Sequence, residues 1–278
     1  MHTLTIDYND KQFERLFVKS LHETGFAVIK NHSIDQNLIN KVYSDWDIFF
    51  KSDKKNNYIF DYEKQDGYFP YKSENAANNN TKDLKEFFHI YPNWGRYPNF
   101  ISEDSLVLFK DLTNLGEQLL KSIDKHSPNS IRKTYSEHLY TMSKDSDQNL
   151  MRVIHYPPIT EINTKNEIRA GAHTDINLIT LLVSGSQPGL QVKGKSNKWI
   201  DIKSQKGQII VNNGDMLQEC SGNYFPSTLH KVVNPKKSNN ISRFSIPLFI
   251  HPRNDVILSD RYTAGSYLLE RLQDIGLK

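Results

Sequence analysis

The hydrophobic pattern changes in the second half of the chain, and this change limits the folds that the sequence can adopt. From Leu150 to Ile257, short β-branched and leucine-rich segments alternate with turn residues. After Asp175, for example, INLITLLV and GLQV are separated by a Gly/Ser/Pro turn and predict two adjacent strands. Turn signals repeated at roughly 8 to 12 residues are typical of a sandwich or barrel. We therefore predict a mainly β fold with helical additions.

The helical additions are predicted at both ends of the chain. In each, apolar residues recur three and four positions apart, which places them on one face of a helix. In chain order, the predicted helices are one capped by Asn9 or Asp10 and ended by Gly25, one after Asp35 with Trp46 and Phe49 inward, one from Ser105 to His126, and one from Thr263 to Gly276 with Leu268, Leu269, Leu272 and Ile275 inward.

Composition excludes several classes of protein. The 35 basic and 32 acidic residues give a net charge of +3, so neither nucleic acid nor a membrane is a predicted partner. The N-terminal residues lack the basic start and apolar core of a signal peptide, and no apolar run reaches membrane-spanning length. Cys220 is the only cysteine, which excludes an intrachain disulfide and a thiolate metal cluster. These features predict a cytoplasmic protein.

Two histidines and an aspartate carry the strongest chemical signal. His173 and Asp175 share strand parity, so their side chains point to one face, and His230 follows 55 residues after Asp175, before the strand-like KVV. A bare His-x-Asp pair is weak, because it also occurs by chance. Together with a distant histidine, however, it is the ligand set of a facial triad, which holds one face of ferrous iron. Downstream, Arg243 and Ser245 share one strand face, and an inward arginine there requires a carboxylate partner, either internal or from a ligand.

Seven segments in this order resemble the isopenicillin N synthase-like branch of the iron(II)- and 2-oxoglutarate-dependent dioxygenases. They are RVIHYPP from Arg152, HTD from His173, LITLL, PGLQV, NNGDMLQ, LHKVVNP and RFSIPLF, which ends at Phe249. GFAVIKNHSI at 25–34 and DLKEFFHI at 83–90 add weaker agreement, and YTAGSYLLERL near the end is similar to bacterial members. The resemblance covers most of the chain and implies a double-stranded β-helix (jelly-roll) core with an N-terminal α/β region and a C-terminal helix.

Residue by residue, the resemblance implies that His173, Asp175 and His230 are the catalytic metal ligands for Fe(II). It also implies that 2-oxoglutarate binds as co-substrate, with O2 as the oxidant, and that its binding residues are Arg243, Ser245 and Tyr156. The implied reaction oxidises a small-molecule substrate, by default through hydroxylation, with release of succinate and CO2. We predict one catalytic unit over 1–278, with a helix-rich region at 1–149, the jelly-roll core at 150–258 and the C-terminal helix at 259–278.

The chain departs from the family pattern at Ile154, where many 2-oxoglutarate users of this branch have Asn. This residue keeps a second interpretation open, an iron oxidase of the same fold that does not use 2-oxoglutarate. A third is a non-catalytic jelly-roll binding protein, although a structural zinc site would require a fourth protein ligand.

Other side chains are assigned less specific roles. We predict that Asp215 is a structural turn residue, that His155 faces away from the iron, and that the Asn-rich segment 72–82 is a surface loop that could cover the site. His89 and His251 have no partner at a motif spacing, so structural roles are predicted for both. By analogy, the pocket could be lined by Phe88, Tyr68 and Phe249.

Overall fold

The structure of the protein is a computed structural model that describes residues 3–74, 82–160, 167–185, 187–203, 205–236, 238 and 240–274. Much of the predicted 72–82 loop, and the predicted helix end at Ile275 and Gly276, lie outside these residues. The elements of the first half are β1 (Thr5–Asp7), α1 (Phe13–Thr24), β2 (Phe26–Lys30), α2 (Gln36–Lys51), the 3-10 helix η1 (Asp53–Tyr58), β3 (Gly67–Phe69), β4 (Glu86–Ile90), α3 (Asp104–His126), α4 (Asn129–Arg132) and α5 (Leu139–Ser143).

The second half is mainly β, as its pattern predicts. Its elements are β5 (Leu150–Tyr156), β6 (Ala170–His173), β7 (Ile179–Val183), β8 (Leu190–Lys193), β9 (Trp199–Asp201), β10 (Ile209–Asn213), α6 (Asp215–Cys220), β11 (His230–Val232), β12 (Arg243–Ile250) and α7 (Ala264–Asp274). The short helix α6 was not predicted, because the NNGDM segment indicates only a turn.

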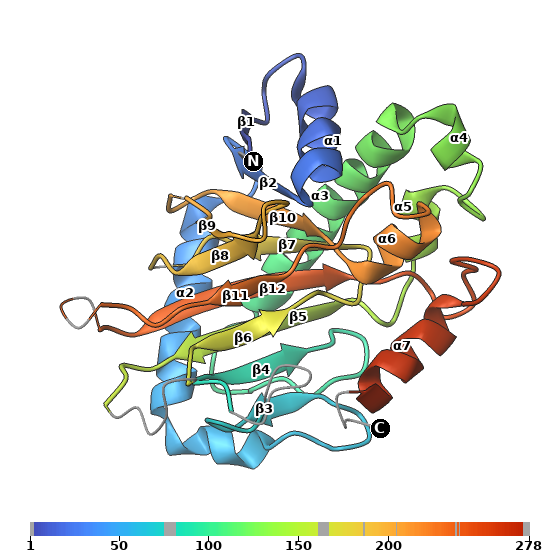
Figure 1. Cartoon of the computed structure of the whole chain (residues 1–278). Coiled ribbons are helices and arrows are strands. Elements are labelled where there is room, and N and C mark those ends of the chain that lie inside the picture. The colour runs from blue at the N-terminus through green and yellow to red at the C-terminus, as the bar shows by residue number, and fades with distance from the viewer. Residues whose placement is uncertain are drawn as a thin grey trace.

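Two sheets form the core (Figure 1). The larger has the strand order β1-β2-β10-β7-β12-β5-β4-β3, and the smaller has the order β6-β11-β8-β9. Every pairing between these strands is antiparallel except that of β1 with β2. Strands β7 and β8, predicted to be adjacent, lie in different sheets, because the turn between them passes from one sheet to the other. This two-sheet arrangement confirms the predicted jelly-roll core.

Side chains alternate between the two faces of the large sheet. On β5, Ile154 and Tyr156 belong to an apolar cluster that includes residues of the small sheet, such as Val192. Met151 and Val153 belong instead to the main core, with residues of α2 and α3. Period-two alternation therefore gives β5 one face toward the interior of the jelly roll and one toward the helices.

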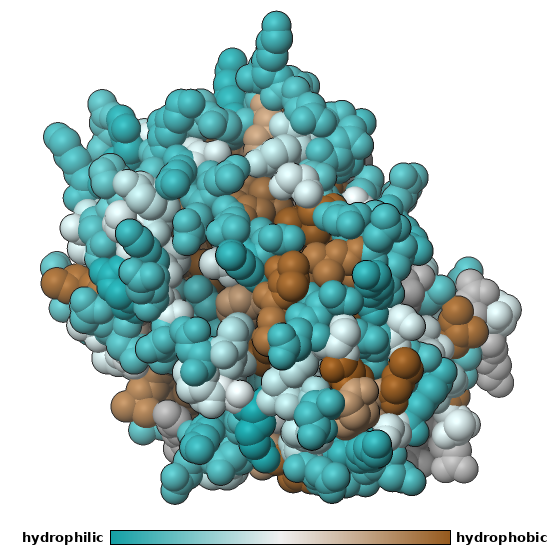
Figure 2. Space-filling model, turned by 180° about the vertical axis from the view of Figure 1, so that it is seen from behind, coloured by the Kyte–Doolittle hydropathy of each residue, from teal (hydrophilic) through white to brown (hydrophobic). Residues whose placement is uncertain are grey.

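Helices cover the outer face of the large sheet. In Figure 1, α2 and α3 run behind this sheet, and α3 contacts β7 and β12. As predicted, α2 follows Asp35, whose carboxylate accepts a hydrogen bond of 2.9 Å from the backbone N–H of Asn37. Figure 2 shows this side of the molecule, where the surface is largely hydrophilic and hydrophobic side chains gather in separate patches.

Two details of the helix predictions are wrong. The residue that caps α1 is Gln12, and the Asp10 carboxylate accepts a 2.8 Å hydrogen bond from its N–H, because a turn precedes the helix. On α7, Leu269 is 46% exposed rather than inward, since the helix is covered on one side only. Among the described residues, every helix is too short or too polar to cross a membrane.

Candidate metal centre and active-site pocket

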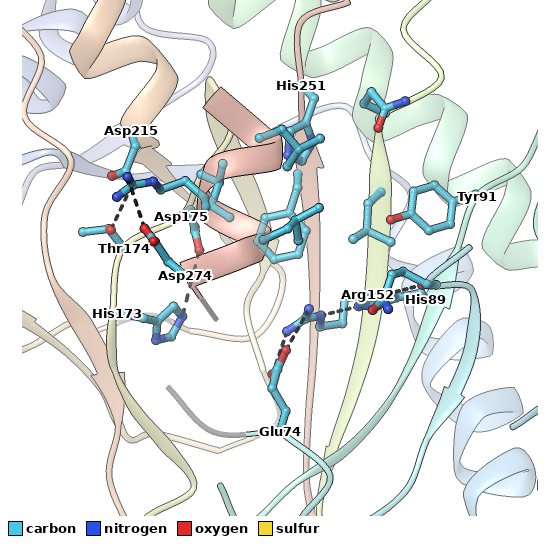
Figure 3. Close-up of a pocket in the computed structure, with 18 of the residues that line it drawn as sticks. Glu74, His89, Tyr91, Arg152, His173, Thr174, Asp175, Asp215, His251 and Asp274 are labelled. Atoms are coloured by element: carbon cyan, nitrogen blue, oxygen red, sulfur yellow. Dashed lines mark hydrogen bonds and ion pairs between the residues drawn. The ribbon is translucent and has the colours of Figure 1, made fainter. Parts of the chain in front are cut away.

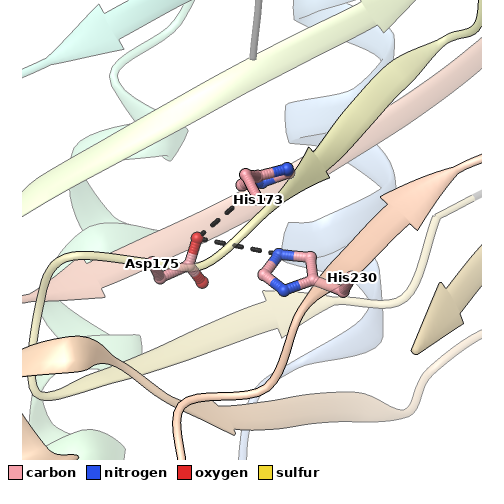
Figure 4. Close-up of side chains that lie close together, drawn as sticks. All are labelled: His173, Asp175 and His230. Carbon is pink, nitrogen blue, oxygen red and sulfur yellow. Dashed lines mark ion pairs between the residues drawn. The ribbon is translucent and has the colours of Figure 1, made fainter. Parts of the chain in front are cut away.

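The three predicted metal ligands come together where the small sheet faces the interior. His173 ends β6, His230 begins β11, and the two residues are direct partners in the antiparallel register. Asp175 follows β6 by two residues and approaches both imidazoles (Figure 4). One ligand atom from each residue lies within 4.8 Å of the other two, and among the described residues this is the group of His, Cys, Asp or Glu side chains that could hold a metal ion.

Both histidines are oriented by hydrogen bonds at Nδ1. This atom lies 2.8 Å from the Gly171 carbonyl oxygen in His173 and 3.1 Å from the Thr228 carbonyl oxygen in His230. A carbonyl oxygen can only accept, so each Nδ1 carries the proton and each Nε2 presents a lone pair. The two Nε2 atoms face Oδ1 of Asp175 at 3.9 and 3.7 Å, beyond hydrogen-bond distance. Three electron-pair donors that converge with no proton between them form a site for a cation.

The protonation states of the ligands suit a metal. Burial, together with the charge of His230, lowers the pKa of His173 and favours its neutral form. Burial alone would raise the pKa of Asp175, but the two histidines and hydrogen bonds from Asn212 and Thr180 lower it. Metal ligands must be deprotonated, and the shifts at His173 and Asp175 both favour that form.

The donor set fits ferrous iron. Two imidazole nitrogens and one carboxylate with open positions are characteristic of non-haem Fe(II) oxygenases. A closed structural zinc site has four protein ligands, whereas the described cluster has three. An ion held here would keep coordination sites for other molecules.

The residues predicted to bind the co-substrate lie on adjacent strands of the large sheet. Arg243 of β12 is the direct register partner of Tyr156 of β5, and its guanidinium carbon is 4.9 Å from the centre of the tyrosine ring. Ser245 is the register partner of Ile154. Arg243 and Ser245 are both buried, and Nη1 of Arg243 has no hydrogen-bond partner among the described residues. A buried, partly unsatisfied guanidinium fits a carboxylate ligand.

Ile154 lies among apolar side chains. It belongs to the buried cluster between the sheets, together with Tyr156, Phe87 and Ala170. The position that is polar in many family members is therefore occupied here by a packed hydrocarbon, and any polar contact must come from another residue.

A pocket of about 890 Å³ opens beside the metal ligands (Figure 3). His173, Asp175 and Asp215 line one side, and the other walls come from β4, β5, β12 and α7. Asp215 starts α6 and accepts a 3.1 Å hydrogen bond from the Thr174 hydroxyl, and burial raises its pKa. It thus lines the pocket in addition to the predicted structural role.

The pocket wall contains a polar network that the sequence motifs did not reveal. Arg152 donates from Nε to Nε2 of His89 at 2.8 Å and pairs with Glu74 at 3.2 Å (Figure 3). Lys85 pairs with the same Glu74 at 2.7 Å and with Asp83 at 2.9 Å. These residues come from segments far apart in the chain. The one signal in the sequence that could have indicated the network is strand parity, because it places Arg152 on the same face as Ile154.

Of the three aromatic residues predicted to line the pocket, one does so. His89 and His251, predicted to be structural, both line the pocket, as does Phe249. Phe88 and Tyr68 instead belong to the main core. His155 lies on the opposite face of β5, as predicted, with hydrogen-bond contacts to Glu86 and Ser242.

Comparisons with known proteins agree with this geometry. The sequence model of the 2OG-Fe(II) oxygenase superfamily matches residues 147–252, and that of the N-terminal region of a non-haem dioxygenase in morphine synthesis matches residues 4–104. The 1-aminocyclopropane-1-carboxylate oxidase of Dictyostelium mucoroides is 30% identical over 88% of this chain and 78% of its own length. A crystal structure of a Shewanella oneidensis protein is 45% identical, with a TM-score of 0.90 over the whole of both chains. A Neurospora crassa protein bound to alpha-KG and thymine shares the fold, at 24% identity and a TM-score of 0.77 over 97% of this chain and 96% of that one.

Proposed function

Because the chain belongs to the 2OG-Fe(II) oxygenase superfamily, we propose that its iron is held by His173, Asp175 and His230. It is an Fe(II)- and 2-oxoglutarate-dependent oxygenase that acts on a small molecule. The main support for the ligand assignment is the pair of proton-free Nε2 atoms that face one carboxylate oxygen of Asp175. The far carboxylate of 2-oxoglutarate is bound by Arg243 and Ser245, with Tyr156 as a further hydrogen-bonding partner.

Iron held by these residues would let O2 act as the oxidant, with one oxygen atom entering the succinate formed from 2-oxoglutarate as CO2 is released and the other entering a substrate C–H bond. The chain's own residues supply position and shielding. The Gly171 and Thr228 carbonyls fix the two imidazoles, while Phe249 and Leu268 give the pocket apolar surface near the metal ligands. A substrate held against these walls is kept out of bulk water and close to the open coordination sites.

We also propose that the reaction is a hydroxylation and that the protein is cytoplasmic. The Neurospora crassa protein binds thymine, and the pocket of about 890 Å³ supports a substrate of comparable or larger size. We further propose that residues 1–278 act as one catalytic unit, because β4 of the first half pairs directly with β5 of the second.

Anaerobic spectroscopy tests the assignment of the iron ligands. Fe(II) and 2-oxoglutarate added to metal-free protein should together produce a weak visible charge-transfer band, and succinate release should then report turnover. His173→Ala and His230→Ala should each lose the band and the turnover, because each removes a ligand. His138→Ala, whose side chain is 72% exposed, is the matched control and should retain both. Full activity in either ligand variant would refute the metal assignment.

A separate variant tests the co-substrate site. Arg243→Ala should weaken 2-oxoglutarate binding by roughly 2 to 5 kcal/mol, the range for breaking a desolvated charge pair. The measurement is the 2-oxoglutarate concentration at half-maximal charge-transfer absorbance. Iron binding without a band in the wild-type protein would favour the oxidase that does not use 2-oxoglutarate.

A further inference from the structure

A second buried arginine lies beside the predicted co-substrate site. Arg169 immediately precedes β6 and is 1% exposed, while Arg243 is 2% exposed. The guanidinium carbons of Arg169 and Arg243 lie 5.8 and 4.9 Å from the centre of the Tyr156 ring, so both charges flank the same aromatic side chain. Two buried guanidinium groups, one just before a strand of the small sheet and one on the large sheet, therefore lie against the same ring, and the charge of Arg243 acts on Arg169.

The hydrogen bonds to these two groups are incomplete. Arg169 donates from Nη2 to the Ile241 carbonyl at 2.7 Å, and its Nε has no partner. Arg243 donates from Nε to the Gln187 carbonyl at 3.0 Å, and its Nη1 has no partner. Neither forms an ion pair with a described carboxylate, although 14 ion pairs between a Lys or Arg and an Asp or Glu occur elsewhere in the same residues. The site thus contains two positive charges and two unsatisfied donors.

Such an arrangement is costly without an anion. A buried charge requires a partner, and two like charges near each other repel. Burial and the charge of Arg243 lower the pKa of Arg169 to about 10, so the group is still protonated at neutral pH. A carboxylate has about four acceptor positions on two oxygens, enough to receive donors from two guanidinium groups.

We infer that Arg169 and Arg243 jointly bind the far carboxylate of 2-oxoglutarate, with Arg169 supplying the polar contact that Ile154 cannot make. This inference rests on the proposed co-substrate site and adds a binding residue to it. It explains why an apolar residue is compatible with co-substrate binding at position 154, since the required donor comes from the other sheet.

Arg169 could instead have a purely structural role, in which it only donates a hydrogen bond to the Ile241 carbonyl. Titration with two keto acids distinguishes this role from binding of the far carboxylate. 2-Oxopentanoate has the carbon chain of 2-oxoglutarate but lacks the far carboxylate. Each keto acid is titrated anaerobically into the Fe(II)-loaded protein, and the charge-transfer band gives the dissociation constant. Arg169→Gln should raise the dissociation constant of 2-oxoglutarate by at least about 30-fold and change that of 2-oxopentanoate by less than about 3-fold.

The matched control is Arg253→Gln, since Arg253 is a partly buried arginine paired with Glu137 away from the pocket. This variant should bind both keto acids as the wild-type protein does. If Arg169→Gln does not fold, Arg169→Lys preserves the charge but not the planar fork, and should still weaken 2-oxoglutarate selectively.

Two results would overturn the inference: equal weakening of both keto acids, or no weakening of either. These differ from failure of the proposed function. In that case the wild-type protein itself would bind iron but give no band with 2-oxoglutarate.

Discussion

At the scale of single residues, the metal-binding carboxylate is held on the side away from the histidines. Oδ2 of Asp175 accepts hydrogen bonds from the Thr180 hydroxyl at 2.6 Å and the Asn212 amide at 2.8 Å. Oδ1 is thereby left to face both imidazole Nε2 atoms. Such supporting contacts fix the orientation of a ligand and are a large part of metal affinity.

Replacing Thr180 tests this support. Thr180→Val keeps the shape of the side chain but removes the hydroxyl donor, so Asp175 loses one of its two orienting contacts. We expect Fe(II) affinity to fall about 10- to 100-fold, as measured by anaerobic titration. Thr113→Val removes a hydroxyl that bonds within α3 and is the control, expected to bind iron normally. Unchanged affinity in Thr180→Val would mean that Asn212 alone orients the carboxylate.

Local spacing predicts the metal ligands but not the polar lining of the pocket. His173 and Asp175 are close in sequence, and His230 belongs to a recognisable segment. Arg169 has no such signal, because its relation to Arg243 depends on how two sheets face each other. Likewise, Glu74 and Arg152 are 78 positions apart and meet only in the folded chain.

At the scale of elements, one glycine links a helix end to the metal site. Gly25 ends α1 with φ of 75°, in the left-handed region that favours glycine. A Cβ at this position would lie 2.7 Å from the Pro226 carbonyl oxygen and closer still to the Thr228 hydroxyl oxygen. The backbone carbonyl oxygen of Thr228 in turn accepts the hydrogen bond from Nδ1 of His230.

Gly25→Ala should therefore affect both stability and metal binding. Steric strain in the left-handed region and overpacking should together lower the free energy of unfolding by about 2 to 4 kcal/mol in urea. Movement of Thr228 should also weaken Fe(II) binding. Gly222→Ala is the control, since its φ is 58° but no atom lies within 4 Å of the added Cβ. Gly222→Ala should lose only the free energy that a non-glycine residue costs in the left-handed region. An equal loss of unfolding free energy in both variants would contradict a contact between the added Cβ at position 25 and Thr228.

Helices were easier to predict than strand order. The residues that make α2 and α3 amphipathic lie within a few turns of each other, so their period is visible in the sequence. The placement of β7 and β8 in different sheets depends instead on pairing between distant strands, which local pattern does not determine. The start of α6 at Asp215 was not predicted, because the residues around it are typical of a turn.

At the scale of the whole molecule, buried polar groups join the first half of the chain to the jelly roll. His89 of β4 lies 2.7 Å from the Gln65 carbonyl oxygen through Nδ1, which therefore donates, while its Nε2 accepts from Arg152 of β5. Both ring nitrogens are thus used by the neutral imidazole. Burial, with the charge of Arg152, lowers the pKa of His89 from 6.5 to about 3.

This neutral histidine should make stability depend on pH in a defined window. Between pH 6.5 and 5, His89 stays neutral in the folded protein but becomes protonated in the unfolded chain. The unfolded state then binds more protons, so the stability present above pH 6.5 is lost as the pH falls, by about 1.5 kcal/mol over this window for one such group. His89→Gln cannot titrate, yet its amide can accept from Arg152 and donate to Gln65. Urea unfolding at pH 7, 6 and 5 should therefore show a smaller loss of the free energy of unfolding for His89→Gln than for the wild-type protein. The two proteins share their other titrating groups. Equal losses would therefore show that His89 is protonated in the folded protein.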